Sequence, residues 1–85
     1  MSSFVRNYVY ATLDKERAYQ DRQHGGREHD REHSVSDWIS FMQDYLTDAA
    51  ELCRHGEEKL AKEELRKVVA LGIACFEVYG CPQRI

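Results

Sequence analysis

The chain has 85 residues, of which 42% are apolar and 32% are charged, with a formal net charge of −3. This length limits the chain to one compact domain, and the acidic balance argues against a nucleic-acid-binding protein that works through a broad basic surface. No apolar run reaches the roughly 18 residues of a membrane span, and the first residues do not resemble a secretory signal. We therefore expect a cytoplasmic protein that has neither a membrane nor a nucleic acid as its partner.

Apolar residues are unevenly distributed, since 10 lie in the first 34 positions and 26 in the remaining 51. A chain of this size buries only roughly 60% of its unfolded surface, so the core of one copy is expected to be marginal. The apolar periodicity is helical, and no run alternates between apolar and polar residues as strands do. We predict one all-α domain over residues 1–85, with three helices that assemble into a homodimer or a larger helical bundle.

The first predicted helix is short, covering about residues 4–20, and its apolar side chains form one narrow line. Residues 21–34 contain no apolar side chain and two adjacent glycines, which indicates a long polar loop. His24, His29 and His33 lie in this segment. The last two are four residues apart, a spacing that could bind a transition metal on a helix, but a solvated loop is the simpler interpretation.

The second and third predicted helices form a hairpin that supplies most of the core. The second covers about residues 35–55 and begins at Ser34 and Asp37, a pair typical of a capped helix start. Its apolar side chains, among them Trp38, fill half of its circumference, which is more than one neighbouring helix covers, so we expect it to pack against two or more helices. The third covers about residues 57–79 and ends at a glycine followed by a proline.

Three cysteines, Cys53, Cys75 and Cys81, form an odd number without CxxC spacing. This pattern favours reduced thiols over a disulfide framework or a structural zinc site. Cys53 and Cys75 fall on the apolar faces of their helices, so we expect both to be buried as small hydrophobic residues.

Acidic residues occupy several positions that the helical period assigns to the interior. Glu16 and then Gln20 continue the apolar line of the first helix, and Glu64 lies inside the apolar arc of the third. Asp48 stands at the edge of the apolar face of the second helix, one turn after Asp44. Inward carboxylates from several helices can assemble a magnesium or manganese site. The simpler alternative is that the first helix ends before Glu16, that Glu64 pairs with a nearby Arg or Lys, and that both aspartates are solvated.

Several segments together resemble the all-α nucleoside triphosphate pyrophosphohydrolases, and more narrowly the short MazG-like proteins of phages and prophages. In chain order these segments are Glu16-Arg17, Tyr19-Gln20, Gly25-Gly26 with His29, Asp37-Trp38-Ile39, and residues 63–84. Enzymes of this superfamily are helical dimers or tetramers. They bind magnesium through acidic pairs on two successive helices and split a nucleoside triphosphate into a monophosphate and pyrophosphate.

The resemblance implies a site in this chain. It assigns catalysis to Glu16 and Glu64, magnesium binding to Asp44, Asp48 and Glu64, and nucleotide binding to Arg17, Tyr19 and Gln20. Lys67 is a further candidate for nucleotide binding, because it departs from the pattern of the family. Tyr45 and Lys67 stand where the two acidic motifs of the family carry carboxylates, which would weaken magnesium binding, and the Lys67 ammonium could instead contact phosphate directly.

Three functions remain open at this point. The first is a magnesium-dependent nucleotide pyrophosphohydrolase. The second is a non-catalytic homo-oligomer of the same fold that sequesters a nucleotide or nucleotide-derived signal. The third is an oligomeric helical module that binds a partner protein through its wide apolar face. For Arg17 or Tyr19 taken singly, surface packing is the simpler explanation.

Overall fold

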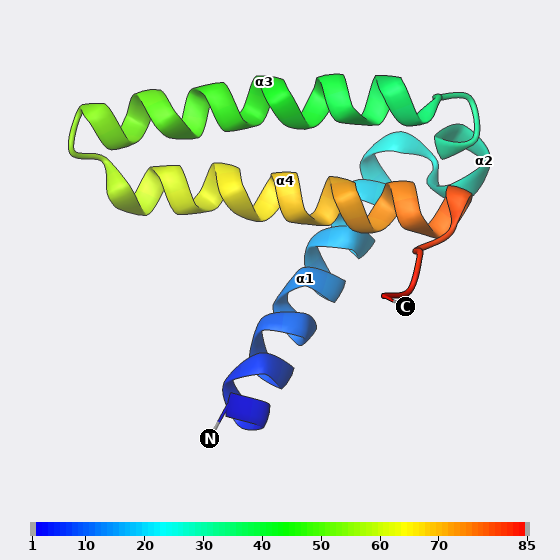
Figure 1. Ribbon diagram of the computed structural model, residues 1–85, viewed down its shortest axis with the longest axis horizontal. Coiled ribbons are helices and arrows are strands. Elements are labelled where there is room, and N and C mark those ends of the chain that lie inside the picture. Colours follow the sequence, from blue (N-terminus) through cyan, green and yellow to red (C-terminus); the bar gives the residue numbers. More distant parts are fainter. Residues whose placement is uncertain (1, 85) are drawn as a thin grey trace.

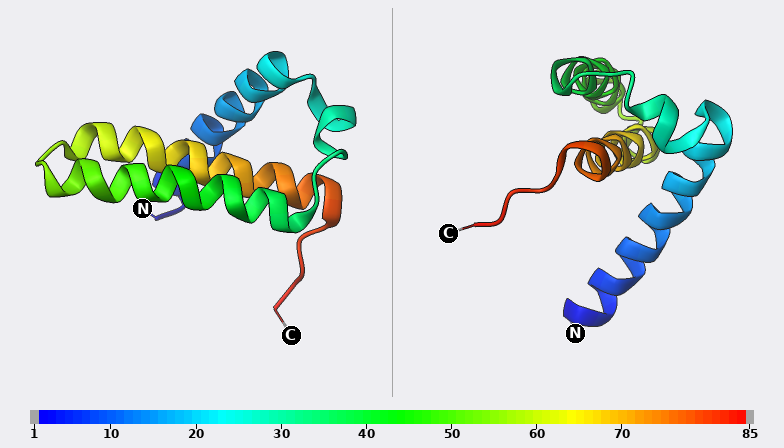
Figure 2. Two further views of the ribbon diagram at one scale, coloured as in Figure 1. Left: turned by 90° about the horizontal axis from the view of Figure 1, so that it is seen from above. Right: turned by 90° about the vertical axis from the view of Figure 1, so that its right-hand side faces the viewer.

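The computed structural model describes residues 2–84 and confirms the all-α prediction (Figure 1). Its helices are α1 (Ser2–His24), α2 (Gly26–Asp30), α3 (Val35–Arg54) and α4 (Glu58–Tyr79). The α3 and α4 helices lie side by side as the predicted antiparallel hairpin. The N-terminal turns of α1 project away from the hairpin, and its later turns cross α4 before α2 begins (Figures 1 and 2). None of the described helices is both long and apolar enough to cross a membrane.

Local hydrogen bonds define the start of α3 and the end of α4. The backbone N–H of Asp37 donates to Ser34 Oγ at 3.1 Å, and the Ser34 N–H donates to Asp37 Oδ2 at 3.0 Å. This capping box satisfies donors that the first turn of α3 leaves free, as the sequence predicts. At the same end of the hairpin, α4 stops at Gly80, whose φ of +87° favours glycine and whose N–H donates to the Phe76 carbonyl at 2.8 Å.

The predictions of a short first helix over 4–20 and a long loop over 21–34 are wrong. The α1 helix has 23 residues and continues to His24, and part of the expected loop forms α2. Arg17 donates to Gln20 at 3.0 Å and to Asp21 at 2.9 Å, so polar contacts between adjacent turns support the last turns of α1 without apolar side chains. Gly25 ends the helix with φ +94°, donating its N–H to the Asp21 carbonyl at 2.9 Å.

The core of the hairpin is small. Trp38, Ala74 and Cys75 are buried together, with partly buried Met42 and Leu71 against them. Within the described chain α3 packs against α4 alone, so the expectation that it packs against two or more helices is wrong for one copy. The apolar arc of α3 is wider than the part of it that α4 covers.

The three cysteines are free thiols, as expected, but only one of the two predicted to be buried is so. Cys75 lies in the core. Cys53 is exposed, in the last turn of α3.

Candidate functional site

Two adjoining pockets lie where α1 and α2 meet the hairpin. The first, which we call the aromatic pocket, has a volume of about 300 Å³. The hairpin contributes Trp38, Phe41, Asp44, Tyr45, Leu71 and Ala74 to its lining. The rest of the lining comes from Arg17, Gln20, His24, His29, Asp30 and His33.

The second pocket, which we call the lysine pocket, has a volume of about 320 Å³. Four residues line this pocket and not the first one: Glu16, Tyr19, Gln23 and Lys67. Gln20, His24, Tyr45 and Leu71 line both pockets. The two pockets are therefore compartments of one site, within the size range of small-molecule sites.

Aromatic rings form one wall of the aromatic pocket. The ring of His33 stands edge-on to Trp38 at 5.7 Å and to Phe41 at 5.1 Å between centroids, and His29 lies 5.3 Å from His33. The hydroxyl of Tyr79 donates to the His33 carbonyl and so ties this turn to the end of α4. The expectation of a solvated loop is therefore wrong for His33, because aromatic packing holds it against the hairpin.

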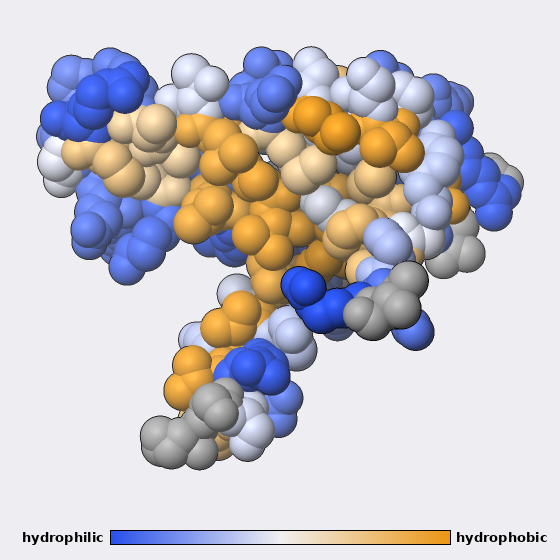
Figure 3. Space-filling model, viewed as in Figure 1, coloured by the Kyte–Doolittle hydropathy of each residue, from blue (hydrophilic) through white to orange (hydrophobic). Residues whose placement is uncertain are grey.

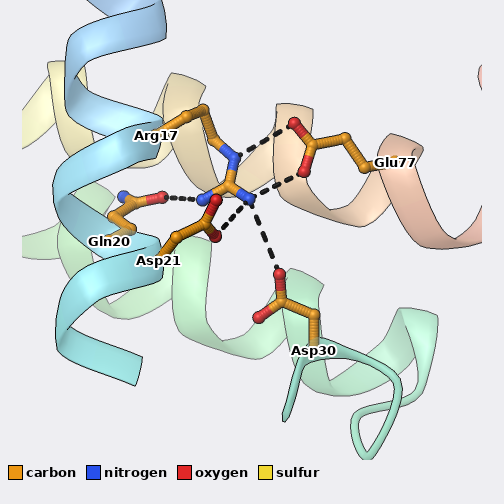
Figure 4. A network of polar contacts seen from close by, with 5 residues as sticks. All are labelled: Arg17, Gln20, Asp21, Asp30 and Glu77. Carbon is orange, nitrogen blue, oxygen red and sulfur yellow. Dashed lines mark hydrogen bonds and ion pairs between the residues drawn. The ribbon is translucent and has the colours of Figure 1, made fainter. Parts of the chain in front are cut away.

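Arg17 lies at the centre of a polar network beside this pocket (Figure 4). Arg17 is only 6% exposed, and its guanidinium donates to both carboxylate oxygens of Glu77, at 3.3 and 2.7 Å. The same group donates to Gln20 and Asp21 in the next turn of α1. Burial lowers the pKa of Arg17, but hydrogen bonds and charge from Glu77 and Asp21 outweigh it and raise the pKa overall. The guanidinium therefore joins α1 to α4 and stays charged.

Asp30 extends this network but is poorly satisfied in it. Its side chain is 8% exposed, and Oδ2 lies 3.6 Å from Arg17 Nη2, an ion-pair distance longer than a hydrogen bond. Among the described residues, neither Asp30 Oδ2 nor the buried Trp38 Nε1 has a hydrogen-bond partner. Burial raises the pKa of Asp30, and the charge of Arg17 opposes this rise only in part. The aromatic pocket thus has one buried acceptor and one buried donor whose bonding capacity is unused.

Lys67 defines the charge of the lysine pocket. Its Nζ donates to Glu64 Oε2 at 2.8 Å and lies 5.6 Å from the centre of the Tyr45 ring. The hydrogen bond to Glu64 raises the pKa of Lys67, so the ammonium is charged at neutral pH. Glu16, which also lines this pocket and whose side chain is 12% exposed, accepts a bond from Arg66 at 3.0 Å.

The structure brings most of the predicted site residues together. Six of them line one or both of the two pockets: Glu16, Arg17, Tyr19, Gln20, Asp44 and Lys67. Asp48 is exposed and lines neither pocket, and Glu64 reaches the site only through its pair with Lys67. The simpler alternative from the sequence is correct on the pairing of Glu64 and on the exposure of both aspartates, but wrong on the end of the first helix.

In the structure, the predicted magnesium ligands are not arranged to bind one ion together. The Glu64 carboxylate already accepts a hydrogen bond from Lys67, and both Asp44 and Asp48 are at exposed positions of α3. No group of three or more His, Cys, Asp or Glu side chains that could hold a metal occurs among the described residues. Magnesium binding by Asp44, Asp48 and Glu64 stays a prediction.

Three features of the site have no clear signal in the sequence. Asp30 lies in a segment without apolar residues, so helical periodicity could not indicate its burial. Glu77 pairs with Arg17 across 60 positions of the chain, and such a contact has no local pattern. Trp38 lies on an apolar helical face, which predicts a core residue, but it also forms a wall of the pocket.

Fold and site together define a small all-α protein with a two-compartment pocket beside a helical hairpin. Comparison of the chain with known protein families, characterised proteins and solved structures finds no match. These comparisons therefore assign no family to the chain.

Proposed function

We propose that this protein binds a nucleotide, with the base in the aromatic pocket and the phosphates in the lysine pocket. The observation that carries the proposal is the continuity of the two compartments through Gln20, His24, Tyr45 and Leu71. One compartment offers aromatic rings on which a base can stack, and the other offers a charged ammonium. A ligand with a planar aromatic end and an anionic end matches both.

Lys67 is the residue on which the phosphate part of the proposal depends. It stands where the MazG-like family carries a carboxylate of its second acidic motif, and it lines the lysine pocket together with Tyr19 and Gln20. Its present partner, Glu64, is a single carboxylate, whereas a diphosphate offers several anionic oxygens. Phosphate can therefore replace Glu64 as the partner of the ammonium.

Isothermal titration of the protein with nucleoside mono-, di- and triphosphates tests this proposal. We expect saturable binding of at least one nucleotide, and we expect Lys67→Glu to weaken it at least tenfold. Lys15→Glu is the matched control, because it makes the same charge change at an exposed position of α1 that lines neither pocket. If no nucleotide binds, or if both variants lose the same affinity, the proposal is wrong.

Hydrolysis is a second candidate function, favoured by the position of Glu16 in the lysine pocket, since the resemblance assigns catalysis to this residue. It is tested on the same samples by adding magnesium or manganese and measuring pyrophosphate. Turnover that Glu64→Gln abolishes would make the protein a pyrophosphohydrolase. Recovery of the intact nucleotide would make it a binding protein that sequesters its ligand.

We further propose a second copy of this chain as the protein partner. The accessible surface of one copy is 6683 Å², whereas a folded monomer of 10.0 kDa exposes about 5,200 Å². The excess of about 1,500 Å² per copy is ample for a stable dimer, which buries about 800 Å² on each partner. Self-association would therefore bring the exposed surface of each copy closer to the value typical of a folded protein.

The apolar groove between α1 and α4 is the surface that such a dimer would cover. It has a volume of about 810 Å³ and is lined by Tyr8, Val9, Leu13, Leu65 and Val69 among others. Tyr8 is 71% exposed and Val69 42% exposed, and apolar residues follow α1 onto the hairpin in Figure 3. Extended apolar patches on a small protein mark interaction sites.

Light scattering coupled to size-exclusion chromatography tests the dimer. We expect the wild-type protein to elute as a dimer or larger species, and Val69→Asp to convert it to a monomer. Val35→Asp is the matched control, because Val35 is similarly exposed at 44% but lies at the start of α3, outside the groove. A monomeric wild-type protein at micromolar concentration would contradict the proposal.

A further inference from the structure

The aromatic pocket is lined by two residues that each have a buried polar atom without a hydrogen bond to the described part of the chain. Asp30 and Trp38 are both more than nine-tenths buried, and both line this pocket. Asp30 Oδ2 is an acceptor and Trp38 Nε1 is a donor, and neither is hydrogen-bonded among the described residues. Burying such groups without partners is unfavourable, so they are explained best by a ligand that supplies the missing bonds.

The charge balance beside the pocket determines which kind of ligand group suits Asp30. The guanidinium of Arg17 faces three carboxylates, those of Asp21, Asp30 and Glu77. Its Nη2 already donates to Asp21 and Glu77, at 2.9 and 2.7 Å, which leaves Asp30 as the carboxylate without a hydrogen bond from it (Figure 4). The local excess of negative charge disfavours a phosphate here and favours N–H donors.

We propose that the aromatic pocket selects a guanine-type base, whose paired N–H donors would bind the carboxylate of Asp30. This inference rests on the nucleotide binding proposed above and specifies which base is bound. Guanine presents N1–H and N2–H₂ side by side, and a carboxylate accepts such a pair with both oxygens. Adenine and uracil place ring or carbonyl acceptors beside their single donor group, and an acceptor facing Asp30 is repelled. The Trp38 N–H would donate to an acceptor of the same base.

Titration with three nucleoside diphosphates that differ in the base tests the selection. We expect GDP to bind about 10- to 100-fold more tightly than ADP or UDP. The protein has a single tryptophan, Trp38, so its fluorescence reports occupancy of this pocket directly. Quenching by GDP at lower concentrations than by ADP is the expected result.

A variant that changes the donor pattern of the pocket gives the stronger test. Asp30→Asn replaces one acceptor by a donor, which matches xanthine, whose N1–H lies beside a carbonyl. We therefore expect Asp30→Asn to prefer xanthosine diphosphate over GDP. Asp14→Asn makes the same chemical change at an exposed position of α1 and is expected to keep the preference for GDP.

The outcomes separate this inference from the proposed function. If no nucleotide binds, the proposed function is wrong and this inference falls with it. If GDP, ADP and UDP bind equally well, nucleotide binding stands and the base selection is overturned. It is also overturned if Asp30→Asn folds, as judged by circular dichroism, and still prefers GDP. If that variant does not fold, wild-type fluorescence titrations decide, and equal quenching by GDP and ADP overturns the selection.

Discussion

Replacing Arg17 by methionine tests whether the buried guanidinium holds α1 against the hairpin. Methionine keeps most of the apolar stem and removes every hydrogen bond and ion pair of the head group. The carboxylates of Glu77 and Asp21 are 39% and 45% exposed, so the ion pair with each contributes at most about 1 kcal/mol. Asp30, at 8% exposure, would be left buried without a nearby cation, which costs a further ~2 kcal/mol.

These contributions predict that Arg17→Met lowers the free energy of unfolding by about 3 kcal/mol. For a domain of this size, that decrease corresponds to a fall of about 12–24 °C in melting temperature. Urea and thermal unfolding followed by circular dichroism, at one fixed protein concentration, measure both quantities.

Arg66→Met is the matched control for this prediction. Arg66 also bridges α4 to α1, through Glu16 at 3.0 Å, but its side chain is 40% exposed. We expect that variant to be destabilised by about 1 kcal/mol or less, because the ion pair of an exposed cation is weakened by water. If Arg17→Met costs no more than Arg66→Met, the central role of the buried network is refuted.

Three further predictions concern the helix cap, the thiols and the buried carboxylate. Ser34→Ala removes the cap of α3 and should lower the free energy of unfolding by about 1 kcal/mol in urea denaturation, and an unchanged midpoint would contradict the role of the cap. A thiol reagent should label Cys53 and Cys81 rapidly and Cys75 slowly, since Cys75 is buried and burial raises its pKa; equal rates by mass spectrometry would speak against this packing. The pKa of Asp30 is raised by burial, so the folded state holds its proton more readily than the unfolded chain, and stability should increase relative to Asp30→Asn as the pH falls through the raised pKa. Parallel urea titrations at several pH values check this, and a pH-independent difference between the two proteins would refute it.

The fold is largely predictable because its signals are local. The capping pair Ser34 and Asp37 and the stop at Gly80 mark the ends of helices through contacts within four residues. The wide apolar arcs of 35–55 and 57–79 predict a hairpin, which the structure contains. The end of α1 escapes prediction because the turns up to His24 are supported by polar contacts between neighbouring turns, and these leave no apolar pattern.

The candidate site is predictable only in part. Glu16, Tyr19, Gln20 and Lys67 are indicated by inward helical positions or by the family resemblance, and all four line the lysine pocket. Asp30 could not be found in this way. Its burial depends on tertiary contacts, because Arg17 lies 13 positions away and reaches it only since α2 folds back beside α1.

Local patterns suffice to place most of the helices, because apolar period, capping residues and glycines act within one or two turns. Which polar groups meet depends on the tertiary arrangement instead. Arg17 meets Glu77 because α1 crosses α4, and it meets Asp30 because α2 folds back beside α1. The energy of a buried charge depends on the partners that surround it. The magnesium ligands that the resemblance implies depend on tertiary contacts as well, since helical spacing alone cannot show that Lys67 donates a hydrogen bond to the Glu64 carboxylate.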